Sequence, residues 1–437
     1  MILRVILKNF LSFDDEVQFD MFPNMKRTSL PNHILKAANK LPVLKMAAIY
    51  GANGAGKSNL VKALEFIQRF VSDKNYIENI EIQNFFHLLN RNSSKEPMYL
   101  AIEFASEESF LFYEMKISKT VVSECLSETV PLQNKIKPIF TRKGPNVEIA
   151  ESEQWEGAIL DLIKRWLKMN QWSSLLSLNE ELPIIQNKKI KYAANWLKRR
   201  LDIIGIHSFM PTLIELLRRE NEIMNFVRKF IPRLELEING VELIKSDFDQ
   251  WAKDHIKIAS SILGNIDKVK SKSMSINANN IPLLSINVED GMRKVWQLRF
   301  ANIGKHGYPG NLDASLQSDG TLRALTLLPA LYYALRGHTV VIDEINCCLS
   351  PTMVKGIVEF FSKSDAKGQL IFTTHEEQLL DERGILRSDE IWFVDKYEGA
   401  SILYSHNDFK EHHTMSPMRG YKEGRYGAIR FINLPKE

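Results

Sequence analysis

Residues 51–58, GANGAGKS, are of the types and spacing that bind the phosphates of a nucleotide. They fit the pattern G-x-x-x-x-G-K-[ST], in which backbone N–H groups and the N-terminus of the following helix face phosphate oxygens. We expect Lys57 to contact the β- and γ-phosphates and Ser58 to bind Mg²⁺. Further nucleotide contacts are expected from the rest of this stretch, namely Asn53, Gly54, Gly56 and Asn59.

Two later apolar runs end in side chains suited to hydrolysis. The first, HTVVIDE at 338–344, ends in two carboxylates, which are costly beside a buried strand unless they meet a cation. Asp343 is expected to hold Mg²⁺, and Glu344 to act as general base on the attacking water. The second, QLIFTTHE at 369–376, places His375 where it would donate a hydrogen bond near the γ-phosphate.

A fourth motif opens the long helix expected at 316–331. Ser318 there can be an N-cap, because its hydroxyl can accept from a free backbone N–H of the first turn. The same stretch also fits an S-x-G signature, in which Ser318, Gly320 and the helix dipole address a γ-phosphate. The residues alone allow both interpretations.

Two further motifs are less specific. Gln83 is a candidate for the Mg²⁺ shell, and it is equally a polar residue at the start of a short loop. Residues 348–351, CLSP, follow the acidic strand and can form either a contact loop between subunits or a plain strand-to-helix turn.

Strands and helices must position these residues, and the hydrophobic periodicity predicts both. A buried strand at 43–50 and a helix at 59–71 flank the phosphate loop. Alternation over 2–20 predicts a hairpin beside the nucleotide strand. Further alternating runs at 98–128, continued at 139–142, predict an accessory antiparallel β-layer, and strands resume at 281–300.

The middle of the chain differs in character. Apolar residues at three- and four-residue spacing predict a mostly helical insertion over 151–264, interrupted by a strand-like LELEI at 234–238. Basic residues, among them Lys198, Arg199 and Arg200, cluster there and can contact a phosphate backbone. They can equally form a solvated helix face balanced by nearby acidic residues.

Length and composition bound the class of protein. A chain of 437 residues suggests two or three domains, and 44% hydrophobic with 25% charged residues is ordinary for a globular protein. The net charge of +4 permits nucleic-acid contact without arguing for it. Three cysteines form no metal-ligand pattern, and we find no signal peptide and no apolar run long enough to span a membrane. A cytoplasmic protein is expected.

In order along the chain, the motifs resemble those of ABC/SMC-type ATPases. More closely, they resemble the AAA-labelled bacterial ATPases related to the ATPase half of OLD-family nucleases. The resemblance rests on NFLSF, IYGANGAGKSNL, LQSDGTLR, VVIDEIN, FTTHEEQLLD, RSDEIWFVDK and EGRYGAI. It implies an α/β fold with a mixed central sheet, with ATPase lobes at 1–150 and 265–437 around the insertion at 151–264. It also implies a head-to-tail dimer in which Ser318 and Gly320 complete the partner subunit's site.

Members of this family often belong to anti-phage systems, in which the ATPase senses infection and controls a separate effector. The resemblance therefore implies a Mg²⁺-dependent ATPase switch, acting as a homodimer or higher oligomer with a separate nuclease or toxin. The loop at 348–351 departs from the Ser-Leu-His-Pro common in relatives. The alternatives are a DNA-repair or DNA-end-processing ATPase that binds DNA or RNA through its basic insertion, and a scaffold that uses nucleotide only for assembly.

Overall fold

The computed structural model forms two compact units. The first comprises Met1–Ile203, Tyr333–Ile345 and Val358–Glu437, and the second comprises Ile204–Tyr332 and Asn346–Ile357. The described residues are 1–106, 108–118, 121–130, 135–150, 157–178, 187–206, 213–260, 273–278, 281–381, 384–409 and 417–429.

A six-stranded sheet of the first unit brings three of the sequence motifs to one edge. Its strand order is β11 (Leu201–Ile204), β17 (Thr339–Ile342), β18 (Gln369–Thr373), β5 (Met46–Tyr50), β19 (Ile391–Tyr397) and β20 (Ala400–Ser405). The pairs β17–β18, β18–β5 and β5–β19 are parallel, whereas β19–β20 is antiparallel. The expected mixed sheet is therefore confirmed, and the C-terminal ends of β5, β17 and β18 lie at the same edge.

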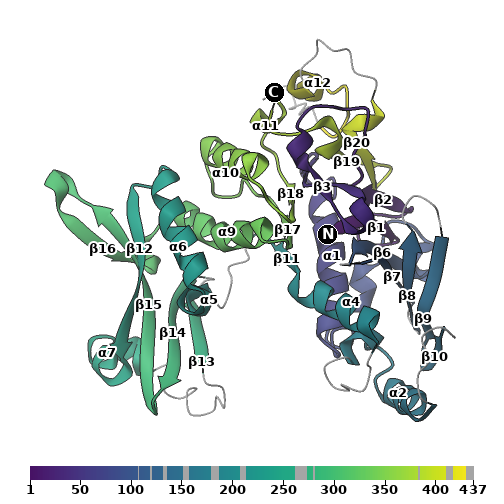
Figure 1. Cartoon of the computed structure of the whole chain (residues 1–437), viewed down its shortest axis with the longest axis horizontal. Coiled ribbons are helices and arrows are strands. Elements are labelled where there is room, and N and C mark those ends of the chain that lie inside the picture. The colour runs from purple at the N-terminus through teal and green to yellow at the C-terminus, as the bar shows by residue number, and fades with distance from the viewer. Residues whose placement is uncertain are drawn as a thin grey trace, which may run out of the picture. The chain divides into compact units, whose positions relative to one another are not determined.

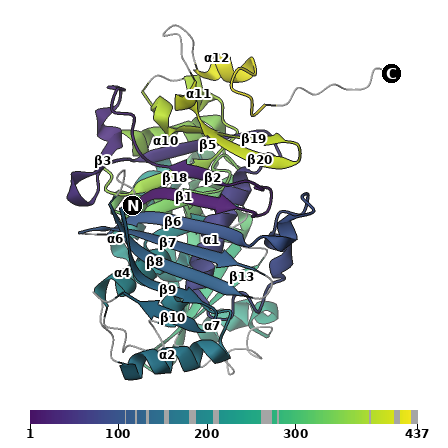
Figure 2. The same ribbon diagram turned by 90° about the vertical axis from the view of Figure 1, so that its right-hand side faces the viewer.

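A second sheet of the first unit is antiparallel throughout. Its order is β10 (Asn146–Ile149), β9 (Lys135–Lys143), β8 (Val122–Val130), β7 (Phe110–Ile117), β6 (Met98–Ala105), β1 (Ile2–Lys8) and β2 (Val17–Asp20). Figure 2 shows β1, β6, β7, β8 and β9 side by side. This is the expected accessory β-layer.

The hairpin expected at 2–20 forms, but its expected position beside the nucleotide strand was wrong. β1 pairs with β2 and with β6 in the antiparallel sheet, and not with β5. The burial pattern of each strand explains why β1 does not pair with β5. β5 is buried along its whole length, as in a parallel strand covered on both sides, whereas β1 alternates from Leu3 onward.

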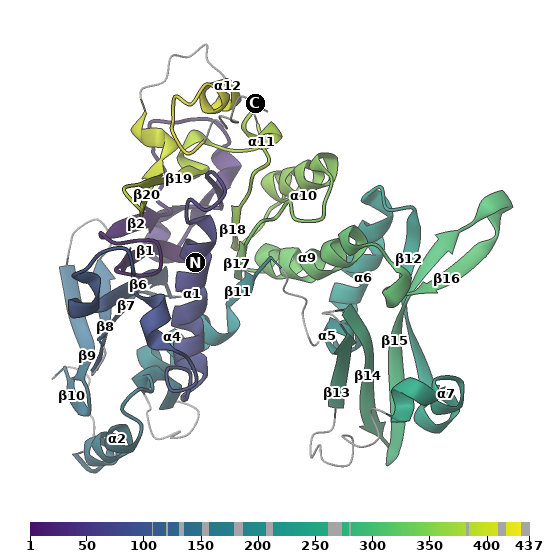
Figure 3. The same cartoon turned by 180° about the vertical axis from the view of Figure 1, so that it is seen from behind.

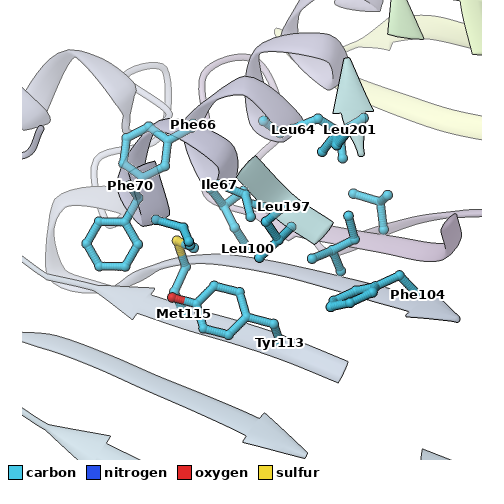
Figure 4. Close-up of a cluster of buried hydrophobic side chains, with 14 of the residues drawn as sticks. Leu64, Phe66, Ile67, Phe70, Leu100, Phe104, Tyr113, Met115, Leu197 and Leu201 are labelled. Carbon is cyan, nitrogen blue, oxygen red and sulfur yellow. The ribbon is translucent and has the colours of Figure 1, made fainter. Parts of the chain in front are cut away.

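The core of the first unit lies between helix α1 (Lys57–Ser72) and the antiparallel sheet. Phe66, Ile67 and Phe70 of α1 are buried against Leu100 of β6 and Met115 of β7 (Figure 4). The remaining helices of this unit include α2 (Gly157–Met169), α4 (Lys188–Arg199), α11 (Gln378–Asp381) and α12 (Pro417–Lys422). Packing of α1 on this core fixes the phosphate loop at its N-terminus.

The second unit is built on another antiparallel sheet. Its strands run in the order β12 (Ile238–Asp247), β15 (Met292–Ile303), β14 (Ile281–Glu289) and β13 (Ser273–Ala278), and β16 (Pro309–Asp313) pairs with β15 (Figure 3). Helices α5 (Leu213–Arg219), α6 (Asn221–Phe230) and α7 (Phe248–Asp254) accompany it, as Figure 1 also shows. Phe248 and Trp251 of α7 share a buried cluster with Val295. The strands expected at 281–300 are confirmed as β14 and β15.

The strand expected at 234–238 was wrong in position. Glu235 and Glu237 have φ angles of 55° and 51°, which break an extended run, and β12 begins only at Ile238. The segment 151–264, expected as one insertion, is mostly helical where it is described, and it contributes helices to both units. The three-part division of the chain remains a prediction.

A buried lysine interrupts the strand expected at 43–50. The chain forms β4 (Pro42–Leu44) and then β5, and Lys45 between them has no exposed surface. Its Nζ donates to the carbonyls of Ser362 and Ser364 at 2.7 and 3.0 Å. These carbonyls end helix α10 (Pro351–Lys363), where a cation also favours the helix dipole. Burial lowers the pKa of Lys45 below its ordinary value.

Over the described ranges, each helix is too short or too polar to cross a membrane.

Candidate nucleotide-binding site

The phosphate loop connects β5 to α1, as its sequence predicts. Gly54 and Gly56 have φ angles of 75° and 119°, which residues with side chains rarely adopt. A Cβ at Gly51 would collide with the carbonyl oxygen of Val394 on β19. Asn53 and Gly54 are exposed at the tip of the loop, while Lys57 opens α1. Glycine is thus required both for the turn and for close packing on the sheet.

Lys57 lies at the centre of the site. Its Nζ donates to the carbonyl of Gly51 at 3.0 Å, and it lies 2.8 Å from Nε2 of His375 and 3.3 Å from Oε1 of Glu344. The side chain is only 4% exposed. Burial lowers the pKa of Lys57, and the charges of Glu344 and Asp343 oppose this effect without cancelling it.

Glu344 follows the end of β17 and faces the same cation. Its backbone is left-handed, with φ of 48°, a conformation that is strained for a residue with a side chain. Oε1 lies 3.3 Å from Nε2 of His375. Burial acts to raise the pKa of Glu344, but the hydrogen bond from His375 and the charge of Lys57 outweigh it, so the pKa lies below its ordinary value.

A chain of hydroxyl and carboxylate groups connects α1 to β17 and β18. Ser58 Oγ donates to Oδ1 of Asp343 at 3.1 Å. Thr373 Oγ1 donates to the same oxygen at 2.6 Å and accepts from the backbone N–H of Glu344 at 2.7 Å. Thr373 therefore orients both acidic residues. The sequence analysis did not identify it, although it stands in the FTTH stretch that ends in His375.

Ser58 and Asp343 fit a Mg²⁺ site, since a hydroxyl and a carboxylate oxygen already lie within one hydrogen bond of each other. The described ranges hold no group of three or more His, Cys, Asp or Glu residues spaced for a metal. Mg²⁺ commonly takes one or two protein ligands and completes its shell with phosphate and water.

A hydroxyl cluster holds the end of the phosphate loop. Ser401 Oγ of β20 donates to the carbonyl of Ala55 at 2.5 Å, and it lies within hydrogen-bond distance, 2.7 Å, of Ser12 Oγ. Asn59 Nδ2 donates to the same Ser12 oxygen at 2.8 Å. The cluster crowds Gly56 so closely that a Cβ there would meet the Ser401 hydroxyl. Ser12 and Ser401 carried no spacing signal, since single serines are common throughout a sequence.

Two of the expected site residues belong to the second unit. Ser318 is exposed just before α9 (Asp319–Leu335), and its Oγ accepts from the backbone N–H of Thr321 at 3.2 Å. It is therefore an N-cap of α9, whatever else it does. Gly320 packs on the loop after the acidic strand, where a Cβ would lie 2.7 Å from the carbonyl oxygen of Cys348.

The loop at 348–351 contains a helix cap. Ser350 Oγ accepts from the backbone N–H of Met353 at 3.2 Å, and Pro351 begins α10. Cys348 has φ of 61° and is exposed. The strand-to-helix turn is therefore present, and a role between subunits stays a prediction.

Gln83 lies in a 3₁₀ turn, Ile82–Phe85, and its side chain is exposed. The turn is tied to the loop that holds Ser12, since the N–H of Leu11 donates to the carbonyl of Phe85 at 2.7 Å. Within the described ranges, no hydrogen bond connects Gln83 to Ser58 or Asp343, so its place in a Mg²⁺ shell stays a prediction.

Comparison with known proteins identifies the family of the chain. A protein-family model described as "AAA domain, putative AbiEii toxin, Type IV TA system" matches residues 46–158 and 195–381. No curated protein matches the chain.

Among solved structures, three SMC head domains are similar at low identity. The SmcHead bound to the C-winged helix domain of ScpA has 14% identity and a TM-score of 0.48, covering 93% of this chain and 99% of that one. The SMC head domain from Thermotoga maritima has 13% identity and a TM-score of 0.39, covering 92% and 98%. The head domain derived from Pyrococcus furiosus, with an extended coiled coil and bound to the C-terminal domain of ScpA, has 14% identity and a TM-score of 0.42, covering 97% and 98%.

The family match includes Lys57, Ser58, Asp343, Glu344 and His375, and it spans more than half of the chain. The chain therefore belongs to this family of AAA-domain proteins and is a P-loop ATPase.

Proposed function

We propose that the chain binds ATP with Mg²⁺ and hydrolyses it, and that the nucleotide state acts as a switch for a separate effector. One observation carries the enzymatic part. Lys57, Ser58, Asp343, Glu344 and His375 converge from the C-terminal ends of three neighbouring parallel strands. Ligands of α/β sheets bind at this edge.

Each side chain has a role that its geometry allows. Lys57 balances the charge of the β- and γ-phosphates, and Ser58 with Asp343 would hold Mg²⁺, which would offset phosphate charge as the bond breaks. Glu344 is ionised at neutral pH, since its pKa lies below the ordinary 4.5, and its carboxylate can orient the attacking water and accept its proton. His375 would donate a hydrogen bond to the γ-phosphate. Thr373 fixes the orientation of Asp343 and Glu344.

The dimeric part of the proposal rests on Ser318 and Gly320. They stand at the N-terminus of a helix of 17 residues, where free N–H groups and the dipole favour an anion. Ser318 is exposed, and both residues belong to the second unit, whereas Lys57 belongs to the first. In a head-to-tail homodimer, these residues would complete the partner subunit's site, where the nucleotide would join two copies.

The separate effector and the sensing of infection rest on the resemblance noted above. The family description adds a link to toxin–antitoxin systems, since it names a putative toxin. We therefore favour a cytoplasmic ATPase that senses infection and releases or activates a separate nuclease or toxin.

The DNA-processing alternative has less support from three of the basic residues on which it rests. Arg218 and Arg219 both donate hydrogen bonds to Glu215. These bonds, of which the one from Arg218 has the largest effect, lower the pKa of Glu215 to about 2. Arg228 donates to the carbonyl of Val241. These arginines of the predicted insertion are thus engaged in structural contacts of the second unit.

Glu344→Gln tests the proposal. The amide keeps the size of the side chain but cannot accept the proton, so ATP turnover should fall by about a hundredfold or more while ATP binding persists. The trapped nucleotide should raise the dimer fraction, measured by light scattering with ATP and Mg²⁺. Unchanged turnover would reject the catalytic role, and a monomer at all nucleotide conditions would reject the dimer.

A further inference from the structure

A second candidate site is a cavity of the first unit that is lined by basic side chains. Its volume is about 900 Å³, within the range of small-ligand pockets. Lys36 and Lys40 line it from the turn between β3 (Ile34–Lys36) and β4, and Arg199 and Arg200 line it from the end of α4.

The cavity lies at the opposite edge of the sheet from the phosphate loop. Arg200 directly precedes β11, and its carbonyl accepts from the N–H of Thr339, the first residue of β17, at 2.9 Å. Gly337, which also lines the cavity, comes just before the same strand. The cavity is therefore at the N-terminal ends of the strands, whereas Lys57 and Glu344 follow their C-terminal ends.

Its four cations lack acidic partners. The described residues that line the cavity include no Asp or Glu. Lys36, Lys40, Arg199 and Arg200 also form no ion pair within the described ranges, unlike Arg142, which contacts Glu124 at 2.5 Å. A helix C-terminus favours basic residues, which accounts for Arg199, but not for the two lysines that come from a separate hairpin.

Packing and hydrogen bonding hold the walls around these cations. Trp196 of α4 stacks on Phe104 of β6, with ring centroids 4.4 Å apart and an interplanar angle of 11°. Tyr192, one turn earlier on α4, donates to the carbonyl of Ala105 at 3.3 Å. In the hairpin, Asn39 and Lys40 both have left-handed backbones, with φ of 51° and 60°. The hairpin and the helix thus hold their cations on two sides of one concave surface.

We propose that this cavity binds a small ligand carrying two or more phosphate groups, at a site separate from the ATP site. Cations on two walls suit more than one phosphate, and the guanidinium groups of Arg199 and Arg200 can each donate two parallel hydrogen bonds to phosphate oxygens. The exposed amide of Asn195 offers a further polar contact.

Calorimetric titration with inorganic tripolyphosphate tests this proposal. The titration uses the full chain carrying Lys57→Ala, so that the phosphate loop does not contribute. Saturable binding with one ligand per chain is expected, and Arg199→Gln with Arg200→Gln should weaken it about tenfold or more, as charged hydrogen bonds are lost. Arg199→Lys with Arg200→Lys keeps the charge but loses the paired hydrogen bonds, so it should restore only part of the affinity.

A matched control comes from the same helix. Lys188→Gln with Lys191→Gln removes the same charge from α4 but leaves the cavity lining intact, and tripolyphosphate affinity should be unchanged. Equal weakening in the control pair would overturn the proposal, because it would show only general charge attraction. The absence of tripolyphosphate binding at low salt would also overturn it. So would binding of a short DNA duplex, in place of tripolyphosphate, that depends on Arg199 and Arg200.

Discussion

The two edges of the parallel sheet hold positive charge in different ways. At the C-terminal edge, Lys57 is within 3.3 Å of both a carboxylate and an imidazole, and an acidic pair is held by Thr373. At the N-terminal edge, four cations line one cavity without an acidic residue among the described lining. Proton transfer needs groups of both kinds, whereas binding an anion needs only positive charge. These charges therefore suit a reaction at the C-terminal edge and anion binding at the N-terminal edge, as we propose above.

The largest effect that separates the two edges is expected from Lys57→Ala. Loss of the ammonium removes charge stabilisation from the transferring phosphate, so hydrolysis should fall by about a hundredfold or more. Phosphate release with ATP and Mg²⁺ measures this, and tripolyphosphate binding at the opposite edge should persist. Joint loss of both activities, with the fold intact by circular dichroism, would show that there is one site and not two.

A smaller effect is expected from Thr373→Val, which keeps the shape of the side chain and removes its hydroxyl. Asp343 then loses a donor and the N–H of Glu344 loses an acceptor. Unpaired buried polar groups cost about 1–3 kcal/mol, so kcat should fall about tenfold. Thr373→Ser, which keeps the hydroxyl, should recover most of the activity. A change in the melting temperature alone, with kcat unchanged, would mean that Thr373 only supports the fold.

The motifs at the reactive edge could be predicted because each is local in sequence and parallel strands bring their ends together. The antiparallel layer followed from alternation, whereas the α/β class with its mixed sheet followed from the resemblance of the motifs to a known family. The partner of β1 could not be predicted, because strand pairing depends on distant residues. Thr373, Ser401 and Lys45 were missed for a related reason: a hydroxyl or a buried lysine has no spacing that reveals its contact.

Ser401→Ala should have a still smaller effect, confined to the phosphate loop. The hydroxyl donates to the carbonyl of Ala55 and contacts Ser12, and one such hydrogen bond contributes about 1 kcal/mol. KM for ATP should rise about fivefold with kcat nearly unchanged, as steady-state kinetics would show. An unchanged KM would contradict a role of Ser401 in holding the loop.

The smallest effect concerns pH. The pKa of Glu344 lies below its ordinary value of 4.5, so its ionised form adds stability above that pH. This stability should be lost as the pH falls through the lowered pKa. The melting temperature of the wild type minus that of Glu344→Gln should therefore shrink as the solution is acidified below pH 4.5. A difference that grows on acidification would contradict the assigned sign.

Lys45 has a consequence for chemical labelling. Lys45 lies between β4 and β5 along the chain, and its buried ammonium donates to the carbonyls of Ser362 and Ser364 at the C-terminal end of α10. An amine-reactive reagent can reach it only when these elements separate. The extent of Lys45 modification can be measured by mass spectrometry and compared with that of the exposed Lys36 and Lys40. It therefore reports how often the N-terminal end of β5 opens.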